Sequence, residues 1–424
     1  MKLSDIVYVL PELALLLGAA LVFLLDIVWL RRAASAERRM TWLPGVAIIV
    51  LLVAALAMIP SQGQQLVAAT MLSVDAFALF FKALALMGVG LVILTAMPYM
   101  KGRTAFGGEF YALLLITALA ISLAVSANNL ILLYVSFEFL SITSYVLAGY
   151  FRQDRKSGEA ALKYFLYGAT ASAVMLYGMS LVYGSTGTTD LRQIAAALNT
   201  RSQADLIWLM VPAIVMLLAG FGFKASLVPF HQWAPDTYEG APTPVTAFLS
   251  TASKATGFAI LMRVFITAFA GAVSFQWVPV LIVIAVLTMS LGNLVALRQS
   301  NVKRLLAYSS IAQAGYILIG VAAANANPQL TFNGINGVLI YLLAYLFTNL
   351  GAFAVVTVIE NETGKLEIKD YAGLVRRSPW LAGLLTVFLL SLAGIPPTGG
   401  FLGKFFVFGA AVQSQMWVLL AIAA

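Results

Sequence analysis

Cysteine is absent from this 424-residue chain, and histidine occurs once, as His231. Without cysteine the chain cannot form disulfides, hold an iron–sulfur cluster through thiolates or use a thiolate nucleophile. A single histidine also excludes a bis-histidine haem site. We therefore expect any redox centre connected with this protein to lie on other chains.

Charged residues are also scarce, at 10% of the sequence, while hydrophobic residues make up 62%. Soluble globular domains carry about 25% charged and about 45–50% apolar residues. A soluble chain of this composition would expose large apolar patches. Soluble enzymes, nucleic-acid-binding proteins and disordered proteins are therefore excluded, and the chain is expected to use the lipid bilayer as its solvent.

The apolar runs are long and continuous, without the alternating ten-residue pattern of an outer-membrane barrel. They predict an all-α polytopic membrane protein with thirteen spans. The expected spans are about 6–30, 41–59, 74–98, 109–126, 130–150, 159–183, 205–230, 243–269, 276–297, 303–323, 333–359, 379–411 and one that starts near 413. Because Ala424 lies inside this last apolar run, we expect the sequence to be cut within its last helix.

Basic loop residues are distributed unequally between the two sides of the predicted bundle. One side carries only Lys2, Arg192 and Arg201. The other carries sixteen: Arg31, Arg32, Arg38, Arg39, Lys101, Arg103, Arg152, Arg155, Lys156, Arg298, Lys303, Arg304, Lys365, Lys369, Arg376 and Arg377. Since cytoplasmic loops carry the excess of lysine and arginine, the second side is predicted to be cytoplasmic and the N-terminus to face outside. The net charge of +8 thus indicates topology and not a nucleic-acid-binding surface.

Two predicted spans are interrupted by proline and glycine. Span seven reads GFGFKASLVPFHQWAPD and contains Lys224, and span twelve reads SLAGIPPTGGFLGKFF and contains Lys404. Paired broken helices indicate an ion path in inverted-repeat transporters. Because each break is the fourth span in a set of five, we predict three N-terminal helices over 1–108, a first five-helix repeat over 109–270 and a second, inverted repeat over 271–424.

Ionisable residues deep in a membrane span are costly and are functional by default. Glu138, Lys224, Lys254 and Lys404 fall in this class. A carboxylate near a buried lysine changes how firmly the lysine holds its proton, so a glutamate and a series of lysines can form a proton relay. Lys163 is a further candidate, although it lies only one turn inside its span and could reach the interface by snorkelling.

Other charged residues leave alternatives open. Lys82 shares a helical face with Asp75, and it is either part of a structural pair or a snorkelling lysine. Arg263 lies near a helix end and is expected to anchor the helix at the interface. His231 follows the first break, where it serves either in proton uptake or gating or as a hydrogen-bonded hinge residue.

Four segments in collinear order resemble a known family. They are SFEFLSITSYVLAGY, PFHQWAPDTYEGAPTPVTAFLSTASKATGF, NVKRLLAYSSIAQAGYILIG and GIPPTGGFLGKFFVF. They are similar to the antiporter-like subunits of respiratory complex I, and WAPDTYEGAPTPV is most similar to subunit N of the bacterial enzyme. The resemblance implies a proton-pumping subunit of NADH:quinone oxidoreductase. By this resemblance, Glu138 is the carboxylate that modulates Lys224, and Lys224 and Lys254 carry protons through a first half-channel. Lys404 belongs to a second half-channel. The resemblance also favours Lys163 as a relay residue.

The resemblance also implies cofactors, partners and location. NADH, FMN, iron–sulfur clusters and quinone are expected on other subunits, with no cofactor and no metal in this chain. The expected partners are other membrane-arm subunits, including neighbouring antiporter-like subunits, and the lipid of a bacterial inner membrane. A subunit of a multi-subunit sodium/proton antiporter is the alternative, because it shares the broken helices and the glutamate–lysine pair. A membrane scaffold without transport would have no need of four mid-membrane charges.

One position departs from the family pattern. The family often has a histidine after the SSI segment of span ten, where this chain has Gln313. Glutamine cannot carry a proton as an imidazole would. The link between the two half-channels is therefore expected to use Gln313, water and the neutral side chains of span eleven, namely Tyr341, Tyr345 and Asn349.

Overall fold

The computed structural model describes residues 3–30, 36–61, 65–67, 70–104, 106–200, 203–271, 274–325 and 332–424. Lys2, Arg31, Arg32 and Arg201, which entered the topology prediction, lie outside these ranges. The described residues are almost entirely helical, which confirms the predicted all-α membrane fold. Nine of the described helices are long and apolar enough to cross a membrane, and four shorter apolar helices accompany them.

The N-terminal part contains the helices expected over the first three spans. They are η1 (Leu3–Val9), α1 (Leu10–Leu24), the π-helical η2 (Leu25–Leu30), α3 (Ala36–Leu56), η3 (Ile59–Ser61) and α4 (Ala76–Met100). A short antiparallel hairpin, β1 (Gln65–Val67) and β2 (Leu72–Val74), precedes α4 and was not predicted. Asp75 starts α4, because its Oδ1 accepts a hydrogen bond from Ala78 N at 2.8 Å.

The middle part contains α5 (Gly107–Ser126), α6 (Leu130–Ala148), α7 (Arg155–Thr186), α8 (Leu191–Asn199), α9 (Gln203–Ala225), α10 (Trp233–Gly240), α11 (Thr243–Phe248), the π-helical η4 (Leu249–Ser253) and α12 (Lys254–Thr267). Asn129, Asp154 and Asp190 cap α6, α7 and α8 by accepting hydrogen bonds from backbone N–H groups of the first turn. The segments α11, η4 and α12 form one helix that is buried in the bundle.

The C-terminal part contains α13 (Ser274–Ala296), α14 (Val302–Ala322), η5 (Ala323–Asn325), α15 (Gly334–Thr363), η6 (Ile368–Tyr371), α16 (Leu374–Arg377), α17 (Pro379–Ala393), α18 (Gly399–Gln413) and α19 (Trp417–Ala423). The expected span 379–411 is two helices here, α17 and α18. Gly394 ends α17 with a φ of +86°, a conformation that glycine adopts without steric cost.

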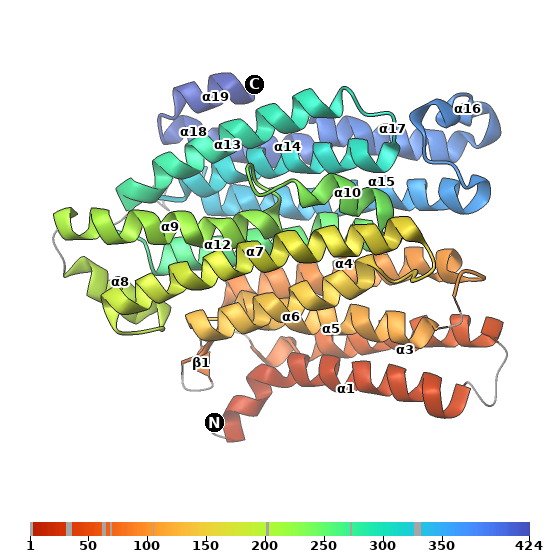
Figure 1. Ribbon diagram of the computed structural model, residues 1–424, viewed down its shortest axis with the longest axis horizontal. Helices are drawn as coiled ribbons and strands as arrows, with labels where there is room; N and C mark the ends of the chain where they lie inside the picture. Colours follow the sequence, from red (N-terminus) through yellow and green to blue (C-terminus); the bar gives the residue numbers. More distant parts are fainter. Residues whose placement is uncertain are drawn as a thin grey trace.

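The long helices lie side by side, with α1 and α3 along one edge of the bundle and α18 and α19 along the opposite edge (Figure 1). Large apolar side chains such as Leu17, Trp42 and Trp380 face outward, whereas Lys224 and Lys254 are buried. This distribution suits lipid as the solvent. The assignment of two inverted repeats to 109–270 and 271–424 stays a prediction.

Candidate functional site

Glu138 lies on α6 and faces α7. The Ser172 hydroxyl of α7 donates a hydrogen bond to Glu138 Oε1 and lies 3.2 Å from the Tyr134 hydroxyl. Glu138 is half-buried, so it lies at the outer boundary of the buried polar groups. Ser141 follows it by three residues on the same face of α6 and contacts the next residue of the series, Lys224.

Lys224 occupies the last turn of α9 and is 1% exposed. Its Nζ lies 3.3 Å from the Tyr164 hydroxyl of α7 and 3.4 Å from Ser141 Oγ. Both separations exceed the usual 2.7–3.2 Å of a hydrogen bond to nitrogen, so these groups surround the ammonium without holding it tightly.

The tryptophan of the WAPDTYEGAP motif supports this arrangement. Trp233, at the start of α10, stacks on Tyr164 with ring centroids 4.2 Å apart. Its Nε1 donates to Phe223 O at 2.9 Å, one residue before Lys224. The motif therefore holds together the end of α9 and the tyrosine beside the lysine, a role that the sequence alone did not suggest.

Lys254 begins α12, directly after the π-helical turn η4, and is 1% exposed. Its Nζ donates to Ser310 O of α14 at 2.9 Å and also to Ser310 Oγ. The backbones of α9 and α12 meet at Gly257, where a Cβ would come 2.9 Å from Ala225 N and 3.2 Å from Lys224 Cβ. Glycine at this position therefore allows the helices that carry the two lysines to touch.

Gln313 connects three helices between Lys254 and Lys404. It follows Ser310 by three residues on α14, and its Nε2 donates to Leu392 O of α17 at 2.8 Å. The Tyr341 hydroxyl of α15 donates to Gln313 Oε1. Two of the neutral groups expected between the half-channels, Gln313 and Tyr341, are thus in contact.

Lys404 follows the second break and is half-buried. Its Nζ donates to Ala393 O at 2.9 Å, at the carbonyl end of α17, where unpaired carbonyls attract a cation. A Cβ on Gly394 would come 2.8 Å from Lys404 Cδ, so the glycine makes room for the lysine chain. Leu392 O, which binds Gln313, is the adjacent carbonyl, so α17 ends between the two groups.

Asn349 of α15 lies beside this series. Its Nδ2 donates to Ser250 Oγ at 2.8 Å, in the π-helical turn before Lys254. Its Oδ1 is buried and has no hydrogen-bond partner among the residues described. Buried polar atoms of this kind are commonly satisfied by water.

Lys163 lies apart from the buried series. Its side chain is 39% exposed, and its Nζ pairs with Asp236 at 2.7 Å and with Glu159 at 2.8 Å. Asp236 also binds Arg304 of α14 at 2.6 Å. Of the relay candidates, Lys163 is therefore the one placed in a surface ion-pair network.

The carboxylates of α10 complete this network. Glu239 binds Arg304 at 3.1 Å and Lys156 at 3.1 Å, so α10 is tied to both α7 and α14. Burial alone would raise the pKa values of Asp236 and Glu239, but hydrogen bonds and charge from their basic partners hold them below the ordinary range. We refer to Lys156, Lys163, Asp236, Glu239 and Arg304 as the α10 ion network.

His231 lies in the turn between α9 and α10. It is 8% exposed, and its Nδ1 has no hydrogen-bond partner within the described part of the chain. Burial lowers the pKa of His231, so the neutral imidazole is favoured.

Two interpretations of charged residues are corrected by the structure. Lys82 does not pair with Asp75. Its Nζ lies 2.6 Å from Glu12 Oε1 of α1, and Ser122 donates to the same oxygen at 2.6 Å. Asp75 instead binds Arg263 at 2.5 and 2.9 Å, so Arg263 is a buried partner of α4 and not an interfacial anchor.

Comparisons with known proteins identify the family of this chain. The family model described as NADH:quinone oxidoreductase/Mrp antiporter, transmembrane, matches residues 127–424. NADH-quinone oxidoreductase subunit N of Desulfitobacterium hafniense is 49% identical over 356 residues, which cover 81% of this chain and 71% of that protein.

Two solved structures share the fold. A chain of respiratory complex I from Thermus thermophilus is 33% identical, with a TM-score of 0.77, and the match covers 97% of this chain and 85% of that chain. A chain of the Mrp complex from Dietzia sp. is 26% identical, with a TM-score of 0.80, over 97% of this chain and 76% of that chain. With nearly half its residues shared with subunit N over most of its length, this chain belongs to the NADH-quinone oxidoreductase subunit N family.

Proposed function

We propose that this chain translocates protons as an antiporter-like membrane-arm subunit of a NADH-quinone oxidoreductase. The observation that carries the proposal is the series of polar groups from Glu138 through Lys224 and Lys254 to Lys404. A charge buried at membrane depth is costly, so two fully buried lysines, with a half-buried carboxylate at one end of the series and a half-buried lysine at the other, call for a transport role.

The first half of the relay runs from Glu138 to Lys254. While Glu138 is ionised it attracts the Lys224 ammonium, and the attraction disappears when Glu138 takes up a proton. Lys224 then releases its proton past Tyr164 and Ser141, which contact the ammonium loosely. Because α9 and α12 touch at Gly257, Lys254 is the next buried base along the bundle.

The second half runs from Lys254 to Lys404. Ser310 accepts from Lys254, and Gln313 lies one turn further along α14. Gln313 and Tyr341 orient water across the gap, and Lys404 receives the proton at the end of α17. Neutral donors and acceptors take the place of an imidazole in this scheme.

Lys163 and His231 act at the edge of the relay. Lys163 positions α10 through Asp236, and α10 in turn carries the tryptophan that packs on Tyr164. His231 serves in proton uptake or gating, since it lies at the break itself. Because Lys163 acts through α10 and does not contact the buried lysines, it is a positioning residue.

The same proposal covers the surroundings of the chain. NADH, FMN, iron–sulfur clusters and quinone belong to other subunits, in keeping with the lack of cysteine. The partners are other membrane-arm subunits, including neighbouring antiporter-like subunits, and the location is a bacterial inner membrane with the N-terminus outside. The chain is organised as three helices over 1–108 followed by inverted repeats over 109–270 and 271–424.

The test is Lys224→Ala in the assembled complex, assayed in sealed inverted membrane vesicles. We expect normal assembly with strongly reduced NADH-driven proton uptake and quinone reduction. Lys369→Ala, at an exposed position of η6, is the matched control and should behave as wild type. Normal proton uptake in Lys224→Ala would refute the proposal.

A sodium/proton antiporter subunit is the second candidate, favoured by the structural similarity to the Mrp complex chain. The two functions differ in their driving force. NADH-dependent acidification of vesicles that is insensitive to sodium supports the first. Sodium-dependent proton exchange without NADH would support the second.

A further inference from the structure

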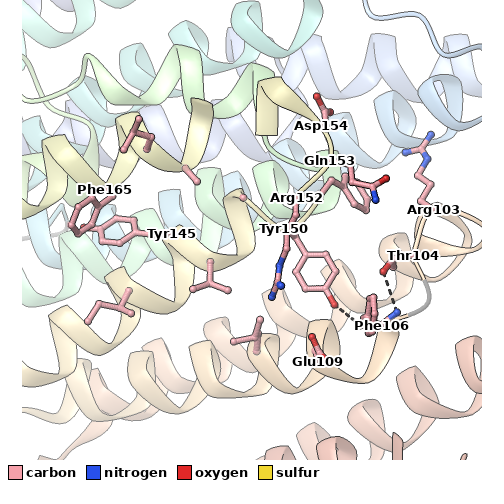
Figure 2. A pocket seen from close by; sticks show the side chains of 17 residues that line it. Arg103, Thr104, Phe106, Glu109, Tyr145, Tyr150, Arg152, Gln153, Asp154 and Phe165 are labelled. Carbon is pink, nitrogen blue, oxygen red and sulfur yellow. Dashed lines mark hydrogen bonds between the residues drawn. The ribbon is translucent and has the colours of Figure 1, made fainter. Parts of the chain in front are cut away.

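A groove of about 1210 Å³ opens between α5, α6 and α7 (Figure 2). Its apolar wall is formed by Leu113 of α5, Ile142 and Val146 of α6, and Leu162 and Phe165 of α7. The volume exceeds the roughly 300–1,000 Å³ of pockets that take drug-sized ligands. The groove therefore suits a long, flexible ligand with an apolar part.

The other end of the groove carries charges of both signs. Arg103 and Arg152 line it together with Glu109 and Asp154, while Phe165 lies at the far end (Figure 2). These two arginines and two carboxylates give this end no net charge. A head group with both a phosphate and an ammonium matches this arrangement better than an anion does.

Arg152 is the group best placed to bind a phosphate. Arg103 is already stacked on the Tyr99 ring, 3.8 Å from its centroid, and the Asp154 carboxylate caps α7. The exposed guanidinium of Arg152 forms no hydrogen bond or ion pair with the residues that the structure describes. Figure 2 shows this side chain directed into the groove beside Tyr150.

We propose that this groove binds one membrane phospholipid of the phosphatidylethanolamine type. Its phosphate binds Arg152, its ammonium faces Glu109, and its acyl chains lie along Ile142, Val146 and Leu162. These three side chains are 56%, 50% and 57% exposed, so an acyl chain would cover apolar surface that the protein leaves open. A chain that crosses the membrane meets such lipids directly.

The site adjoins the proposed relay. Tyr145 forms part of the groove wall and packs edge-on against Tyr164, with ring centroids 4.7 Å apart. The Tyr164 hydroxyl contacts Lys224. If the proposed function holds, the bound acyl chain also keeps water from reaching Lys224 between α6 and α7.

The test uses phosphatidylethanolamine with a photoreactive diazirine in its acyl chain. The purified complex is reconstituted into phosphatidylcholine nanodiscs that contain this probe, and labelled peptides are identified by mass spectrometry. We expect labelling of 142–146 and 162–165. Arg152→Ala should lower it about fivefold, the effect of one basic group near a lipid phosphate. Arg155→Ala, an exposed position outside the groove, should leave labelling unchanged.

Competition tests the head group. Unlabelled phosphatidylethanolamine should displace the probe, whereas diacylglycerol with the same chains should not, and phosphatidylglycerol should do so only weakly. Wild-type labelling in Arg152→Ala, or equal displacement by diacylglycerol, would overturn the phosphate site. Equal displacement by phosphatidylglycerol would overturn the role of the ammonium. None of these readouts depends on proton pumping, so they separate this proposal from the proposed function.

Discussion

Replacing Gln313 with leucine is expected to slow proton transfer between the two halves of the chain. Gln313 is 6% exposed, donates to Leu392 O and accepts from the Tyr341 hydroxyl. Leucine is similar in size but offers neither a donor nor an acceptor. The substitution therefore leaves one buried carbonyl and one buried hydroxyl without their partners.

The size of the effect follows from these two groups. A buried polar group without a partner costs about 1–3 kcal/mol. A proton that crosses the gap must be solvated there, so the barrier rises by at least one such penalty. That corresponds to a rate decrease of about 5- to 150-fold.

The assay is NADH-driven proton uptake by sealed vesicles, with quinone reduction measured in parallel and assembly checked on native gels. Gln313→His keeps a donor and an acceptor and should retain uptake close to wild type. Wild-type uptake by the fully assembled Gln313→Leu complex would show that protons do not pass this position.

Three further substitutions test the structure. Gly394→Ala should lower both thermal stability and proton uptake. Alanine at this position must adopt a positive φ, which costs about 1–2 kcal/mol of folding free energy, and its Cβ crowds the Lys404 side chain. Burial would raise the pKa of Asp236, but its basic partners hold it below 3.8. Its ion pairs should therefore stabilise the protein fully above about pH 4 and fail as the pH falls through the lowered pKa; melting curves of Asp236→Asn should lack this acid-dependent loss. Lys82→Met should destabilise the complex by about 3–5 kcal/mol in thermal unfolding, since it leaves the Glu12 carboxylate buried and unpaired, and adding Glu12→Gln should recover part of the loss.

Hydropathy was sufficient to predict most of the fold. Long apolar runs can form only helices in lipid, so the predicted spans agree with the helices to within a few residues in most cases. The scarcity of charge in these runs also made Lys224 and Lys254 conspicuous. Both are buried as expected.

The charge partners could not be predicted, because they are set by packing between distant segments. Asp75 and Arg263 are 188 residues apart, and Lys82 pairs with a glutamate on α1. The spacing of Lys82 and Asp75 along one helix suggested that they form a pair. In the fold, α1 instead supplies Glu12 as the partner of Lys82, and α12 supplies Arg263 as the partner of Asp75. The α10 ion network likewise requires α7 and α14 to meet at α10, which no local pattern indicates.

The absence of a side chain at Gly257 has a mechanical consequence. Where two backbones touch, no side chain between them can be compressed or rearranged. The helix ends that bear Lys224 and Lys254 must then shift together as one body. We therefore expect their backbone separation to stay constant through a transport cycle, with switching left to the reach of the lysine side chains, to water and to the charge state of Glu138.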